Sequence, residues 1–200
     1  MARPRYRQGD MPARDKLITA FWSLLSERPF DQITVRLLSD AAGLNHNTFY
    51  YHFGSMEELA KEALDDAAPF NYVMLAAPTF LRTGLIPDEL NDNPELENAF
   101  LRVKLFAKSD SPLLNNMIRK KITSIWAAAL GIDEEALGPD GRKSITFLIG
   151  GAMAVLGDYP DLQLRDFLDM LAGSIGSAAR NILVQLAADS QSGQFRAADQ

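Results

Sequence analysis

The chain has 200 residues, 47% of them hydrophobic, with no cysteine and only two histidines. This composition supports a folded core and excludes disulfides, thiolate metal sites and a cysteine nucleophile. Two histidines are too few for a histidine-rich metal centre, so we expect no metal and no cofactor. The longest apolar runs, such as residues 145–156, are too short to cross a bilayer, and no apolar signal core follows the basic N-terminus. We therefore expect a cytoplasmic protein without a membrane partner.

The net charge of −6 is unevenly distributed. Residues 1–56 contain seven Lys and Arg against five Asp and Glu, whereas residues 57–200 contain thirteen against twenty-one. A phosphate responds to charges within about 8 to 10 Å at physiological salt, so the local excess matters more than the total. Arg3, Arg5 and Arg7 form a basic arm, which either contacts DNA or is a disordered, solubilising tail.

The first predicted helix spans residues 12–27, where apolar residues recur at three- and four-residue steps. It ends before Pro29, because the residue before a proline avoids the α region. Thr34 caps a short second helix. Gly43 then breaks the chain, since glycine accepts the positive φ of a tight turn.

Asn45 caps a third predicted helix that runs to about Phe53. Ser55 and Glu58 have the spacing of a capping box that begins a fourth helix. Prolines and capping residues place the later helices near residues 70–82, 94–108, 112–130, 139–157 and 161–188. Strand-like alternation is absent from the sequence, so we expect an all-α protein of about nine helices.

Residues 33–59, ITVRLLSDAAGLNHNTFYYHFGSMEEL, have the pattern of a helix-turn-helix, in which the second helix enters the major groove of DNA. This segment resembles the TetR family of bacterial transcriptional regulators. The resemblance implies a three-helix DNA-binding head over residues 1–54 and a helical effector-binding and dimerisation body over residues 55–188. Residues 189–200 are polar and are expected to be a frayed tail.

The polar residues of the third helix are suited to DNA. Asparagine presents a donor and an acceptor to adenine, whereas hydroxyl and imidazole groups reach phosphates, as the matching Thr, Tyr and His do in the resembling family. The predicted DNA-binding residues are Arg36, Asn45, His46, Asn47, Thr48, Tyr50, Tyr51, His52 and Ser55. Phe49 and Phe53 fall on the opposite face and should be buried. Arg36 has an alternative role, an ion pair with Asp40.

The sequence departs from the family pattern at three positions. Met56 stands where the family commonly has a lysine that contacts phosphate, so one contact is missing. Asn47 replaces a common glycine and adds a group that can read a base. Ser39 replaces the usual alanine and is still small enough for two helices to approach closely.

The last two predicted helices are apolar over more than one face, which predicts a second buried surface. We expect a two-fold homodimer built as a four-helix bundle, also the family arrangement, on a pseudo-palindromic double-stranded operator. Burial within a monomer is the alternative. The predicted interface residues are Met153, Leu156, Phe167, Leu171, Ile175, Ala178 and Ile182.

Residues 70–130 are rich in aromatic residues and methionine, which suit an apolar or amphipathic effector but also an ordinary core. The candidate effector contacts are Tyr72, Phe100, Arg102, Met117 and Trp126. The predicted function is a transcription repressor released from its operator by that effector. A helical ligand-binding or protein-interaction module with a decayed DNA-binding head is the alternative. The sequence contains no phosphate-binding loop, nucleophile elbow or metal-ligand spacing, so we do not expect an enzyme.

Overall fold

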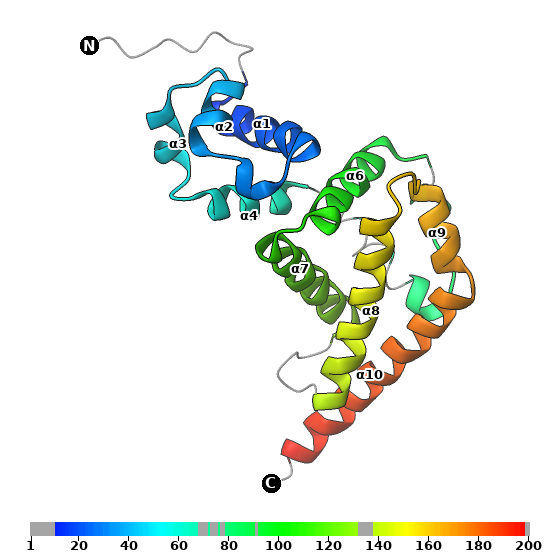
Figure 1. The fold of residues 1–200 in the computed structure, drawn as a ribbon. Helices are drawn as coiled ribbons and strands as arrows, with labels where there is room; N and C mark the ends of the chain where they lie inside the picture. Colours follow the sequence, from blue (N-terminus) through cyan, green and yellow to red (C-terminus); the bar gives the residue numbers. More distant parts are fainter. Residues whose placement is uncertain are drawn as a thin grey trace. The chain divides into compact units, whose positions relative to one another are not determined.

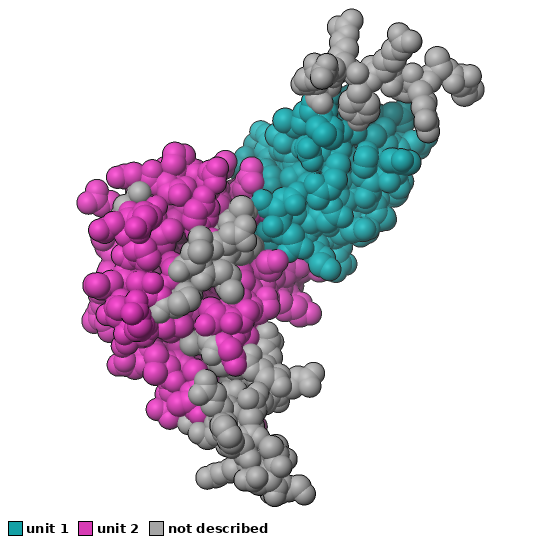
Figure 2. Space-filling view, turned by 180° about the vertical axis from the view of Figure 1, so that it is seen from behind, with its two compact units in different colours: residues 1–66 teal, residues 67–200 magenta. Residues whose placement is uncertain are grey.

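The computed structural model describes residues 11–67, 72, 76, 79–90, 92–131 and 138–198. Every regular element in these ranges is a helix, which confirms the predicted fold class (Figure 1). The chain divides into two compact units, Met1–Asp66 and Ala67–Gln200, which Figure 2 shows in different colours. We call them the head and the body. The basic arm with Arg3, Arg5 and Arg7 lies outside the described residues.

The head consists of four α-helices and one short 3-10 turn: α1 (Ala13–Glu27), η1 (Phe30–Gln32), α2 (Val35–Ala41), α3 (His46–His52) and α4 (Met56–Asp66). Helix α1 packs against α2, α3 and α4, and α2 packs against α3. The predicted bounds of the first three helices are therefore correct to within a residue or two.

Short side chains begin the helices of the head as predicted. The Thr34 hydroxyl accepts a hydrogen bond from the Leu37 amide at 3.2 Å, and Asn45 Oδ1 accepts one from the Asn47 amide at 2.9 Å. Ser55 Oγ accepts from the Glu58 amide at 3.1 Å, but Glu58 Oε2 returns to the Gly54 amide at 2.7 Å, one residue before the expected position. These bonds satisfy amides that have no partner within the helix.

The turn between α2 and α3 depends on Gly43, whose φ of +65° is in the left-handed region. A side chain there would crowd the following carbonyl oxygen, a cost of roughly 1 to 2 kcal/mol that glycine avoids. The Leu44 amide donates to the Ser39 carbonyl at 2.9 Å across this turn. The sequence therefore fixes the angle at which α3 leaves α2.

The core of the head is aromatic. Phe21, Leu38 and Phe49 are fully buried, and Phe53 is 1% exposed. The Phe49 and Phe53 rings lie 5.8 Å apart, and Phe21 meets Phe30 edge-on at 6.2 Å. The burial predicted for Phe49 and Phe53 is thus confirmed, and it fixes which face of α3 is left exposed.

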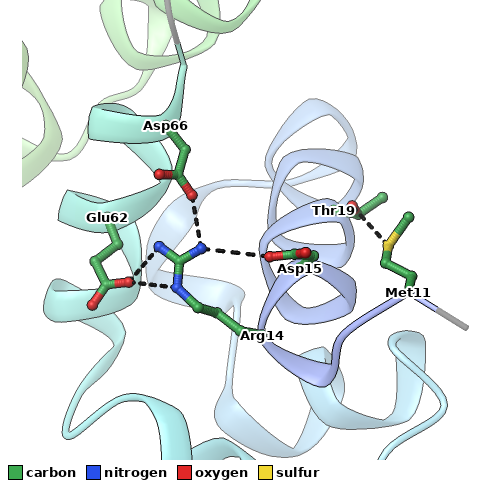
Figure 3. Close-up of polar contacts among 6 residues, drawn as sticks. All are labelled: Met11, Arg14, Asp15, Thr19, Glu62 and Asp66. Carbon is green, nitrogen blue, oxygen red and sulfur yellow. Dashed lines mark hydrogen bonds and ion pairs between the residues drawn. The ribbon is translucent and has the colours of Figure 1, made fainter. Parts of the chain in front are cut away.

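Helix α4 is attached to α1 through Arg14 (Figure 3). The Arg14 guanidinium donates to Glu62 at 2.6 and 2.9 Å and to Asp66 at 3.0 Å. These hydrogen bonds raise the pKa of Arg14 above its ordinary value, and the bond to Asp66 contributes most. Leu59 is fully buried on the same helix. The packing boundary therefore follows Asp66, after α4, whereas the predicted boundary was at residue 54.

The body contains η2 (Asp88–Leu90), α6 (Pro94–Lys108), α7 (Pro112–Leu130), α8 (Pro139–Asp158), α9 (Leu164–Ala172) and α10 (Ser174–Ala198). Asn93 Oδ1 caps α6 by accepting from Glu95 and Leu96 amides, and Ser111 Oγ accepts from the Leu114 amide at the start of α7. Of the helix predicted near residues 70–82, only part lies in the described residues, where residues 79–83 are helical.

The single helix predicted over residues 161–188 is wrong, because the structure has two helices there. Gln163 and Asp166 cap α9, and Gly173 adopts an extended backbone that ends it. Gly176 lies so close to the Leu171 carbonyl that any Cβ would collide with it. The chain can therefore turn sharply between α9 and α10.

The prediction of a frayed tail over residues 189–200 also needs correction, since α10 continues to Ala198. Once a helix exists, each added residue forms a further backbone hydrogen bond, so a polar sequence can extend it. Helices α8 and α10 lie side by side around Ile145, Ile149 and Leu186, which form a buried cluster (Figure 1).

Ser39 provides a first prediction. Its side chain is 1% exposed, and its hydroxyl has no hydrogen-bond partner among the described residues. Because a buried, unsatisfied hydroxyl is destabilising, Ser39→Ala should raise the free energy of unfolding of the head by about 1 kcal/mol. Urea unfolding followed by the fluorescence of Trp22, which is buried in α1, measures it in a Trp126→Phe background. Ser26→Ala is the control and should bring no gain, because the Ser26 hydroxyl donates to the Ser23 carbonyl at 2.6 Å. A loss of stability in Ser39→Ala would contradict the prediction.

Arg14 provides a second prediction. Its side chain is about one third exposed, so solvent screening limits the worth of its ion pairs. Arg14→Met should lower the free energy of unfolding of the head by about 0.5 to 1 kcal/mol and loosen α4, as seen by hydrogen exchange. Lys143→Met removes an exposed ion pair with Asp140 and should have no measurable effect. Unchanged amide protection in α4 of the Arg14 variant would show that the attachment is unimportant.

Candidate DNA interface and body cavity

Helix α3 presents a polar and aromatic face to solvent. Asn45, His46 and Asn47 are exposed, as are Tyr50 and Tyr51, at 56% and 85%. Thr48 and His52 are half-buried, and Ser55 is exposed just before α4. Eight of the nine residues predicted to bind DNA thus lie within one short segment, and none of them is buried. The ninth, Arg36, is on α2.

The rings on this face are ordered by their neighbours. The His46 and Tyr50 rings meet edge-on with centroids 5.2 Å apart, and Tyr50 makes a similar contact with the buried Phe49. Tyr51 and His52 are 5.1 Å apart. Edge-to-face pairs restrict ring rotation, so the Tyr50 hydroxyl is held outward from a buried anchor.

Two of the predicted DNA-binding side chains have structural roles in the head. Asn45 Oδ1 accepts from the Asn47 amide at the N-cap of α3, so one of the two lone pairs of this oxygen is used within the head. The Arg36 side chain is 88% exposed, and its Nε lies 3.9 Å from Asp40. This is the alternative ion pair anticipated from the sequence, in a long geometry that leaves the guanidinium accessible.

The α4 N-terminus follows the same surface. Met56 is half-buried there, and Glu57 and Glu58 lie in the first turn of the helix. The Ser55 hydroxyl accepts from the Glu58 amide but keeps its own proton for donation. Acidic groups at this position disfavour a phosphate, so Ser55 is a weaker anchor than a lysine would be.

The body contains a cavity of about 240 Å³ between α6, α7, α8, α9 and α10. Three of the five predicted effector contacts, Tyr72, Phe100 and Trp126, line it. Arg102 and Met117 are half-buried but do not line it. Sequence reasoning missed the contributions of α8, α9 and α10, such as Ala152 and Leu183, because long-range packing brings them there.

Polar groups beside the cavity bond away from its interior. The Tyr72 hydroxyl donates to Glu95 Oε2 at 2.6 Å, a bond that raises the pKa of Tyr72. The Lys104 ammonium, 5.7 Å from the centre of the Phe100 ring, donates to the Pro160 and Leu162 carbonyls at 2.7 Å each. The cavity walls are thus fastened by polar bonds, while its lining is apolar.

The residues predicted for a dimer interface divide into two groups. Leu156 is buried, Leu171 and Phe167 line the cavity, and Met153 and Ile182 pack on the α8–α10 cluster. Only Ile175 and Ala178 lie at the surface, Ile175 at 63% exposure. The sequence could not separate the two groups, because all seven residues are apolar.

The exposed apolar residues of these helices include others that the sequence analysis missed. Phe147 is 78% exposed on α8, on the same face as the exposed Gly150, Gly151 and Ala154. Val184 is 44% exposed on α10. Their signal in the sequence was the three- and four-residue spacing of small and apolar residues.

Other kinds of site find no support in the described residues. Those residues contain no group of three or more acidic or histidine side chains that could hold a metal ion. Within them, no helix combines the length and the apolar character needed to cross a bilayer.

Comparison with known proteins places the head. Residues 17–63, from α1 to α4, match the family model described as bacterial regulatory proteins, tetR family. Searching the curated proteins gave no match. A solved structure titled as a TetR-family regulator from Streptomyces coelicolor is similar, with 20% sequence identity and a TM-score of 0.47, over 90% of this chain and 99% of that one. The matched residues of the head include all of α2 and α3. Residues 17–63 of the head are thus similar to the tetR family of bacterial regulatory proteins.

Proposed function

We propose that the protein is a cytoplasmic transcription repressor that binds a pseudo-palindromic operator as a homodimer and leaves it when the body binds a small effector. The observation that carries the proposal is the exposed polar face of α3, held by buried Phe49 and Phe53 in a helix-turn-helix of the tetR family. Such a helix is short enough to enter the major groove with its first turn against base edges.

The side chains of α3 differ in what they can recognise. Asn47 is exposed on the first turn and can form two bonds with adenine, whereas the Asn45 oxygen caps the helix. His46 is exposed beside it and can donate to or accept from a base. Tyr50, Thr48 and His52 are suited to phosphates, which fix the register of the protein on the duplex.

In this proposal, most of the positive charge that attracts DNA comes from the basic N-terminal arm. Arg14 is committed to Glu62 and Asp66, and Arg28 lies 3.7 Å from Glu27. Arg3, Arg5 and Arg7 then provide the cationic charge that attracts phosphates or a narrow minor groove.

The two operator half-sites require two heads. Phe147 and Ala154 share an exposed face of α8 with Gly150 and Gly151, small residues that let helices approach closely, and Ala178 and Val184 are exposed apolar residues of α10. Two copies joined by this surface form a four-helix bundle, and their α3 helices can then reach major grooves about 34 to 36 Å apart.

The effector step uses the body cavity. A ligand that binds more tightly when the two heads have the wrong spacing shifts the population toward that state and weakens operator binding. Because the size of that shift is limited by the difference in ligand affinity between the two states, the effector must fit the cavity differently in each.

A second candidate is a ligand-binding module whose head no longer binds DNA. It is favoured by one observation: Met56, Glu57 and Glu58 occupy the start of α4, where a phosphate contact would need a cation. The experiment below distinguishes the two functions.

Substitutions on α3 should separate base recognition from phosphate contact. Asn47→Ala should cost about 1 to 3 kcal/mol on the preferred sequence and reduce discrimination against altered operators. Tyr50→Phe keeps the ring contacts and should weaken all sequences by about tenfold, because only the hydroxyl is lost. Fluorescence anisotropy with DNA flanking the protein's own gene, at two salt concentrations, measures both effects.

The comparison between these two variants is the control, since each keeps the fold of α3. If the unaltered protein retains no fragment even at low salt, the head is decayed and the repressor is excluded. If Asn47→Ala leaves the sequence preference intact, Asn47 is not a base reader.

The proposed dimer surface can be tested by placing a charged residue within it. Phe147→Glu should give a monomer by light scattering, because it places a carboxylate in the centre of an apolar contact. Operator affinity should fall by about a hundredfold or more, since the two heads no longer bind as one molecule. Leu101→Glu is the control: it changes a leucine of α6 that is 53% exposed and should leave both the oligomeric state and the operator affinity unchanged. A dimeric Phe147→Glu protein would place the interface elsewhere.

A further inference from the structure

The body cavity has an unusually uniform lining. Among its described lining residues are Phe80, Phe100, Phe167, Leu156 and Leu183, and none carries a formal charge. The only side-chain polar atoms in the described lining belong to Tyr72 and Trp126. The Tyr72 hydroxyl is already bonded to Glu95.

One sequence segment that contributes to the lining is also without charge. Residues 67–80, AAPFNYVMLAAPTF with Ala67 first, include no Asp, Glu, Lys, Arg or His. Three of the described members of this stretch, Tyr72, Ala76 and Phe80, line the cavity. The sequence therefore offers no counter-ion from this segment.

Two cations on the helices that form the cavity are bound to backbone carbonyls. Lys104 donates to two backbone carbonyls of the loop between α8 and α9. Arg180 of α10 donates to the Leu81 and Arg82 carbonyls at 2.7 and 2.9 Å. Both fasten the walls of the cavity, so neither could pair with an anion inside without releasing a wall.

The volume limits the size of a ligand. A cavity of about 150 Å³ lined by apolar residues holds benzene, which has six carbons. At the same packing, a cavity of about 240 Å³ takes about ten non-hydrogen atoms.

We infer that the cavity binds an uncharged, predominantly hydrocarbon molecule of about ten non-hydrogen atoms and rejects carboxylate and ammonium analogues of the same shape. The physical reason is desolvation. A buried ion without a partner is strongly disfavoured, whereas one hydroxyl is tolerated at low cost. This inference rests on the proposed function of the body as the effector-binding unit, and it replaces an apolar or amphipathic effector by one ligand class.

The two tryptophans allow a direct test. Trp22 is in the head and Trp126 lines the cavity, and the chain has no other tryptophan. The full-length Trp22→Phe protein therefore has fluorescence from Trp126 alone. Decan-1-ol, decanoate and decylammonium are matched probes that share one chain and differ in charge.

Decan-1-ol should shift Trp126 emission saturably, and decanoate and decylammonium should bind at least about tenfold more weakly. Ala152→Leu, which fills the cavity from α8, should weaken decan-1-ol by about tenfold or more. Ala128→Leu adds the same atoms at an exposed position of α7 and should leave binding unchanged. Calorimetry on both variants confirms that they are folded and provides a second measure of affinity.

Several outcomes overturn the inference: equal or tighter binding of decanoate or decylammonium, no binding of decan-1-ol, or equal binding in the Ala152 and Ala128 variants. Operator binding measured in parallel tests the proposed function separately. If decan-1-ol binds through the cavity but leaves operator affinity unchanged, the ligand class stands and effector release fails. If operator binding is intact but no decan-1-ol binds, the ligand class fails and the DNA-binding function stands.

Discussion

The exposed face of α3 exists because Phe49 and Phe53 are buried. A helix of seven residues is far too short to be stable alone in water, since its nucleation cost exceeds the few backbone bonds that it forms. The two rings anchor it against the rest of the head, and the Asn45 cap and the Gly43 turn fix its start and its direction. Once the aromatic face is committed to the core, the polar face can only point outward.

Polar and apolar groups are also separated in the body, but there the functional surface is the apolar one. There the polar groups face away from the centre: Tyr72 bonds to Glu95, and Lys104 and Arg180 bond to backbone carbonyls. Charge-assisted bonds of this kind hold loops and helix ends without placing a charge in the interior. The result is a cavity whose walls are held by polar bonds but whose surface recognises only apolar shape.

Head and body therefore pose different recognition problems. DNA recognition requires exposed donors and acceptors with a fixed orientation, which α3 supplies through rings and caps. Ligand recognition in an uncharged cavity depends on volume and desolvation. Coupling between them requires a ligand that prefers one arrangement of the dimer. The cavity is lined in part by α8 and α10, the helices proposed to join the two copies.

The sequence by itself determined most of the local structure. Thr34, Asn45 and Ser55 begin helices as predicted, and Asn93 and Ser111 cap helices of the body, because a cap acts over three residues and needs no distant partner. The helix-turn-helix and its exposed polar face followed from the same local signals. Bending at Gly173 escaped detection, since glycine within an apolar helical pattern is compatible with either a continuous or a broken helix.

Only the tertiary structure decided how the apolar residues are shared. Ile182 packs on the buried α8–α10 cluster, Leu156 and Leu171 line the cavity and Ile175 is exposed, although all four suit any of these places. Likewise Arg14 of α1 bonds to Glu62 of α4 across 48 residues of sequence. Hydrophobic burial has no direction and no preferred partner, so a pattern of apolar residues shows that a face is buried but not against what.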